Sequence, residues 1–75
     1  MKQTLDMIVP GKVWTIQQIH TENRFSERLK DYGIVPGTKV ICQYCSPGGH
    51  LVALECRGAV VALRREDLRG ITVEA

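Results

Sequence analysis

Turn signals divide this chain of 75 residues into short segments. Pro10-Gly11 and Pro36-Gly37 are typical of type II turns, because proline fixes the first corner and glycine supplies the positive φ of the second. The stretch Ser46-Pro47-Gly48-Gly49 is the strongest loop signal in the chain. Each Pro-Gly pair precedes an alternating apolar run. We therefore expect turns that lead into strands.

The runs between the turns are predicted to be strands, since they alternate apolar with polar residues or are rich in β-branched ones. The predicted strands cover residues 12–20, 39–44, 51–57, 59–64 and 71–74. Alternation in the second run places Cys42 and Tyr44 on one face, which we expect to be buried. Cys56 is expected in the core on the same grounds.

One helix is expected between the first two strands. Asn23 is a candidate N-cap, and Phe25, Leu29 and Tyr32 recur with the spacing of one helix face. Gly33 is well placed to end the helix in the left-handed conformation. A helix this short needs to pack on the rest of the domain to persist.

The first strand is ambiguous, because neither of its faces is cleanly apolar. If Val13 and Ile19 are buried, Trp14 faces outward, where a tryptophan is typical of a partner contact. In the alternative, Trp14 and Ile16 form the core face. The apolar segment Ile34-Val35-Pro36 is a second candidate contact, and it is equally compatible with packing that seats the helix.

Residues 65–69 are predicted to form one helical turn that stops at Gly70. With five short strands and one inserted helix, the chain is predicted to adopt a small all-β fold, a partly open five-stranded barrel. Closure is favoured because a single small sheet would leave both edges and an apolar face exposed. At least one strand edge stays free, so a homo-oligomer could form by pairing there.

The length predicts one domain over residues 1–75. A domain of this size buries only about 60% of the surface that its unfolded chain exposes, so its core is thin. Little room remains for an internal active-site cavity, which favours a binding or structural role. The composition, 44% hydrophobic and 24% charged, is typical of a globular protein.

Charge and hydropathy give a first view of partners and location. The formal charge of +2 is too small to indicate a nucleic-acid or acidic-membrane partner by itself. No apolar run approaches the roughly 20 residues that span a bilayer, and residues 1–7 lack the apolar segment of a signal peptide. The three cysteines, an odd number, fit a reducing compartment. We expect a cytoplasmic protein without direct membrane insertion.

The cysteines are the main candidate for a metal site. Cys42 and Cys45 have C-x-x-C spacing, His50 and Cys56 follow, and four such side chains can hold zinc or iron. However, a regular strand points residues 42 and 45 to opposite faces, whereas metal knuckles need a tight turn between the cysteines. A redox C-x-x-C normally opens a helix, which this one does not. We expect no metal and no cofactor.

No residue pattern supports an enzyme. Gly48-Gly49 lacks the lysine and helix of a P-loop, and no paired carboxylates or Ser/His/Asp arrangement stands out. Arginines gather late in the chain, but Glu66 and Asp67 dilute their charge. The arginines concerned are Arg57, Arg64, Arg65 and Arg69. A solvated, salt-bridged face is therefore favoured over nucleic-acid binding.

The ordered set of these segments resembles the FeoA family, small partner proteins of the bacterial ferrous iron transporter FeoB. Residues 28–37 are similar to the family's RL-x-x-L-G-x-x-PG segment, with Tyr32 where leucine is more usual. Residues 61–65, Val-Ala-Leu-Arg-Arg, resemble the family's strand end, and residues 71–74 its closing strand. The resemblance runs from about Leu5 to Glu74.

The resemblance implies an SH3-like barrel without catalytic residues, which binds the cytoplasmic part of FeoB and modulates transport. The contact residues predicted above from the strand pattern and the apolar segment are Trp14, Ile34, Val35 and Pro36. Two alternatives stay open. One is a small metal-binding protein that uses the three cysteines and His50. The other is a generic SH3-like module that binds peptides or nucleic acid.

Overall fold

A computed structural model describes residues 2–75, so only the first residue of the predicted domain lies outside it. Six strands form one sheet in the order β1-β6-β2-β3-β4-β5, with antiparallel pairing throughout. The strands are β1 (Lys2–Thr4), β2 (Val13–Ile19), β3 (Lys39–Cys45), β4 (Leu51–Cys56), β5 (Ala59–Arg64) and β6 (Ile71–Glu74). The helix α1 (Asn23–Asp31) and two 3₁₀ turns, η1 (Leu5–Met7) and η2 (Arg65–Leu68), complete the described chain.

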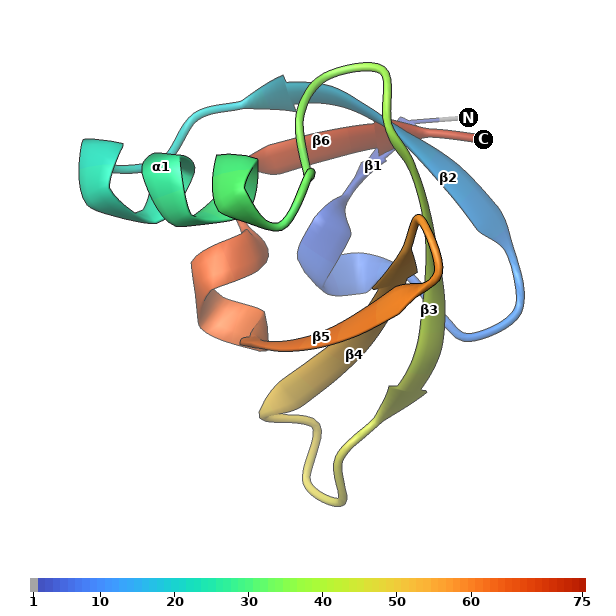
Figure 1. Ribbon diagram of the computed structural model, residues 1–75. Helices are drawn as coiled ribbons and strands as arrows, with labels where there is room; N and C mark the ends of the chain where they lie inside the picture. The colour runs from blue at the N-terminus through green and yellow to red at the C-terminus, as the bar shows by residue number, and fades with distance from the viewer. Residues whose placement is uncertain (1) are drawn as a thin grey trace.

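The sheet is strongly curled, and α1 and η2 lie together at one end of it (Figure 1). The two described ends are side by side, because Lys2 pairs with Glu74. The prediction of a small all-β fold with one inserted helix is confirmed. The number of strands is wrong by one, because β1 consists of three polar residues that carry no apolar alternation. Its strand conformation comes from pairing with β6.

The core takes side chains from the strands, α1 and both 3₁₀ turns. Leu5 of η1 and Leu68 of η2 are fully buried. Complete burial of a leucine contributes about 1.5–3 kcal/mol, so each of these two leucines stabilises the fold as much as a buried leucine in a strand does. The other fully buried large aliphatic side chains are Ile16, Leu29, Ile34, Leu54 and Ile71.

A bulge in β2 explains why neither face of this strand is cleanly apolar. Trp14 and Ile16 point into the core and are 2% and 1% exposed. The pairing with β6 then shifts between Ile16 and Gln18, and Gln17 and Gln18 are both exposed. A bulge adds one residue to one strand, so the inward face changes phase. Ile19 is therefore the next side chain to pack against the core.

β3 contains a second bulge, where the pairing with β4 shifts between Cys42 and Tyr44. Cys42 is buried, Gln43 and Tyr44 are both exposed, and Cys45 packs against the core again. The prediction that Tyr44 shares the buried face of Cys42 is wrong, since its side chain is 58% exposed. The extra residue of the bulge is the reason.

The α1 helix begins one residue earlier than expected. Asn23 is its first residue, and the N-cap is Glu22, which makes no side-chain capping bond. Phe25 and Leu29 are buried as predicted. Tyr32 is 37% exposed, because the helix has already ended there and the residue is the C-cap.

The end of α1 is a Schellman motif. Gly33 has the predicted positive φ, +83°. Its N–H donates to the carbonyl of Lys30, and the N–H of Ile34 donates to the carbonyl of Leu29. Leu29 and Ile34 are both fully buried, which is the apolar contact that usually accompanies this motif. Ile34 therefore seats the helix on the sheet.

Candidate docking surface

The contact residues predicted from the sequence do not form one surface. The expectation that Trp14 faces outward is wrong, and the alternative in which Trp14 and Ile16 form the core face is confirmed. Trp14 pairs with Val40, and the Lys12 ammonium lies 4.9 Å from the centroid of its ring. Ile34 is fully buried as well. Only the half-buried Val35 and the exposed Pro36 reach solvent.

Val35 and Pro36 belong to a turn that fixes the chain between α1 and β3. The N–H of Thr38 donates to the carbonyl of Val35 at 3.0 Å, and the N–H of Gly37 donates to the carbonyl of Ile16 at 2.8 Å. The buried Thr38 hydroxyl donates to the carbonyl of Gly33 at 3.1 Å. The segment thus joins the helix end to β2, in agreement with the packing alternative.

Exposed apolar side chains gather instead on the outer face of the sheet. Val13 lies opposite Ile41, Ile41 opposite Glu55, and Glu55 opposite Val60, so these residues form one row across four strands. In the next row Tyr44 lies opposite Ala53, which lies opposite Ala62. Five of these residues, Val13, Ile41, Tyr44, Val60 and Ala62, are referred to below as the outer-face band.

The outer-face band offers an aromatic anchor among aliphatic neighbours. Val13, Tyr44 and Val60 are 46%, 58% and 56% exposed. The one charged residue of these two rows is Glu55, whose carboxylate accepts a hydrogen bond from the Gln43 amide. Sequence reasoning missed Tyr44, since the bulge that turns it outward leaves no mark in the alternation.

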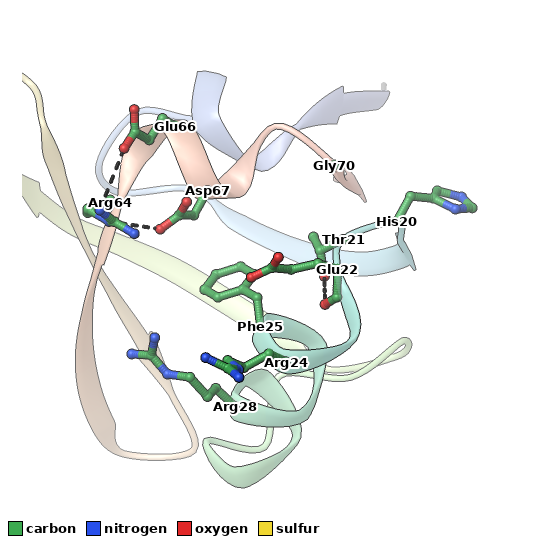
Figure 2. A pocket seen from close by; sticks show the side chains of 10 residues that line it. All are labelled: His20, Thr21, Glu22, Arg24, Phe25, Arg28, Arg64, Glu66, Asp67 and Gly70. Carbon is green, nitrogen blue, oxygen red and sulfur yellow. Dashed lines mark hydrogen bonds and ion pairs between the residues drawn. The ribbon is translucent and has the colours of Figure 1, made fainter.

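A charged groove separates α1 from η2 (Figure 2). It encloses about 290 Å³. Phe25 points into it from the helix, and on the opposite wall Arg64 pairs with Asp67 at 2.9 Å and with Glu66 at 3.7 Å. Its lining residues are His20, Thr21, Glu22, Arg24, Phe25, Arg28, Arg64, Glu66, Asp67 and Gly70. Arginines and carboxylates alternate around it, as expected for a solvated, salt-bridged face.

The groove brings no nucleophile and base together among its lining residues. The Thr21 hydroxyl donates to the backbone carbonyl of Glu22 at 3.4 Å. The His20 ring points away from the other lining residues (Figure 2) and contacts the side chain of Gln18 at 3.0 Å. The lining is therefore suited to ionic contacts with a partner.

The four residues of the predicted metal alternative do not converge on one site. Within residues 2–75, no three His, Cys, Asp or Glu side chains converge in an arrangement that could hold a metal ion. The Cys56 thiol contacts the carbonyl of Gly33 at 3.8 Å, and His50 is exposed at the end of the β3–β4 hairpin.

Cys42 and Cys45, in contrast, are neighbours. The prediction that they point to opposite faces is wrong, because the bulge in β3 returns Cys45 to the inward side. Burial and the adjacent Cys45 thiol raise the pKa of Cys42 to about 11, while Arg65 acts in the opposite direction. The Arg65 guanidinium donates to Cys45 Sγ at 3.0 Å.

The fold defines a small all-β domain of the SH3-like type. The family model of the FeoA domain matches residues 3–75, and the chain belongs to the FeoA family. Membership implies a role in ferrous iron transport. No helix of the described chain is long and apolar enough to cross a membrane.

Several solved structures are similar to this chain. The FeoA protein from Chlorobium tepidum is 28% identical, with a TM-score of 0.90 over 96% of this chain and 69% of that one. The FeoA-like protein from Clostridium acetobutylicum is 27% identical, with a TM-score of 0.85 over 97% and 85%. Iron(II) transport protein A from Clostridium thermocellum is 25% identical, with a TM-score of 0.90 over 96% and 44%. No curated protein sequence matches the chain.

Proposed function

We propose that this chain is a non-enzymatic accessory protein of bacterial ferrous iron uptake. It acts in the cytoplasm by binding the cytoplasmic part of an FeoB-type transporter, and binding modulates transport. The observation that carries the proposal is the outer-face band, in a chain whose family belongs to ferrous iron transport. Exposed apolar surface around an aromatic residue is typical of protein docking sites.

Within this proposal the predicted contact residues divide into two groups. Val35 and Pro36 stay predicted contacts, since both reach solvent. Trp14 and Ile34 support the surface from inside the core. Pairing of a second copy at a free edge also stays a prediction, and β5 is the apolar edge strand that it would use.

The test uses the immobilised chain and detergent-solubilised membranes of the organism that makes it. The wild type is expected to retain FeoB, and Tyr44→Ser to retain at least about tenfold less, because loss of an anchoring aromatic costs 2 kcal/mol or more. Tyr32→Ser is the matched control, since Tyr32 is exposed but lies at the end of α1. It is expected to bind as the wild type does.

Two results would overturn the proposal. One is a wild-type chain that retains no FeoB with or without nucleotide. The other is equal retention by Tyr44→Ser and the wild type, which would remove the outer-face band from the contact.

A further inference from the structure

The bulge in β3 places two cysteines within reach of each other. Cys42 lies opposite Leu54 and Cys45 opposite Val52, so the two cysteines face residues only two apart on β4. Two steps along a strand span about 6.6 Å. This is near the upper end of the Cα separations found in disulfides, about 4.4–6.8 Å. The Cys42 thiol contacts the backbone carbonyl of Tyr44, one residue before Cys45, at 3.8 Å.

The two thiols differ in their access to solvent. Cys42 is 1% exposed, whereas Cys45 is partly exposed. The guanidinium of Arg65 lies 3.0 Å from Cys45 Sγ. Reactive cysteines sit in electropositive, partly exposed surroundings, and Cys45 meets both conditions.

Arg65 has no carboxylate partner among the described residues. Its other donors go to the backbone carbonyls of Asp6 and Gly49. The positive charge beside Cys45 is therefore available to that sulfur. The guanidinium can also donate a hydrogen bond to the oxygen of a sulfenic acid that forms on Cys45.

We propose that Cys42 and Cys45 form a dithiol that hydroperoxides oxidise to an intramolecular disulfide. The Cys45 thiolate attacks hydrogen peroxide, which breaks the O–O bond, gives Cys45 sulfenic acid and releases hydroxide. The Cys42 sulfur then attacks the Cys45 sulfur, its thiol proton leaves with the hydroxyl group as water, and the S–S bond forms. Together the two thiols lose two electrons and two protons, and the peroxide is reduced to two water molecules.

The roles follow from burial. Peroxide reaches the partly exposed Cys45, which is therefore the first thiol to react. Cys42 lies in the core as a protonated thiol and reacts second. Formation of the S–S bond draws the Cys45 sulfur towards Cys42 and away from Arg65. Because Arg65 also holds η1 and the hairpin at Gly49, oxidation is expected to loosen both segments.

The test treats the reduced full-length chain with hydrogen peroxide and alkylates the remaining thiols. Mass spectrometry of the tryptic peptide that covers residues 40–57, which holds all three cysteines, then locates the alkylated one. We expect alkylation at Cys56 alone and a disulfide between the other two. The pair is expected to react at least about tenfold faster than Cys56, because Cys56 is 2% exposed whereas the attacking Cys45 reaches solvent.

Variants assign the steps. Cys56→Ala is the matched control and is expected to oxidise as the wild type does. Cys42→Ala is expected to stop at a sulfenic acid on Cys45 that dimedone traps. The proposal is overturned if all three thiols react at one rate, or if the disulfide includes Cys56. The wild-type peptide alone decides this, whether or not a variant folds.

Discussion

At the scale of single residues, Cys42 couples ionisation to folding. Burial first, and then the neighbouring Cys45, raise the pKa of its thiol from 9.0 to about 11, against the opposing charge of Arg65. In this range the unfolded chain loses the thiol proton before the folded chain does. The stability that Cys42 contributes is therefore complete below pH 9 and is lost as the pH rises towards 11.

We expect the free energy of unfolding of the reduced protein to fall between pH 9 and pH 11 by up to about 3 kcal/mol through Cys42, in urea titrations. Cys42→Val keeps an apolar side chain of similar size and should remove this part of the fall. All other ionisable groups are the same in the two proteins, so the difference between their pH profiles isolates the thiol. Parallel pH profiles for the two proteins would contradict the assignment.

Trp14 is a second residue whose burial determines the effect of its substitution, which here is on the free energy of unfolding. Its ring is 2% exposed, so Trp14→Ala is expected to lower the free energy of unfolding by about 3–5 kcal/mol. The indole N–H has no hydrogen-bond partner within residues 2–75, so Trp14→Phe should cost less than half of that. Urea midpoints check both values. A Trp14→Ala midpoint equal to that of the wild type would mean that the ring is not in the core.

At the scale of elements, the sequence predicts the strands and the helix to within about two residues at each end, apart from β1. Turn chemistry and alternation carry this information. The phase of alternation was not predictable in β2 and β3, because a bulge depends on the partner strand and not on local residue pattern. Three consequences follow from these two bulges, namely the buried Trp14, the exposed Tyr44 and the paired thiols.

The junction of β2 with β6 depends on Gly70. A Cβ at this position would overlap the carbonyl oxygen of His20, whose N–H donates to the Gly70 carbonyl at 2.7 Å. Gly70→Ala should therefore destabilise the protein by about 3 kcal/mol or more, since the backbone itself must move.

Gly11→Ala provides the control for Gly70→Ala. Gly11 also has a positive φ, +99°, but a Cβ there meets open space. Its cost should be limited to backbone strain of about 1–2 kcal/mol. Thermal unfolding of both variants tests this order, and an equal loss at the two positions would contradict the overlap at Gly70.

At the scale of the whole molecule, the candidate site arises from the pairing of strands distant in sequence. Val13, Ile41 and Val60 belong to three separate strands and become neighbours only through the register of the sheet. The sequence predicts the fold and the family, since both depend on turns and on the order of segments. It does not predict the band, because no local pattern specifies which outward side chains meet across the sheet.

The most direct measurement is an NMR titration of the ¹⁵N-labelled chain with the purified cytoplasmic part of FeoB. We predict that amide shifts and broadening concentrate on the outer-face band, around Ile41, Tyr44, Val60 and Ala62, with the amides of α1 unchanged. Shifts confined to the groove between α1 and η2 would place the contact elsewhere. A spectrum that stays unchanged at saturating FeoB would contradict docking itself.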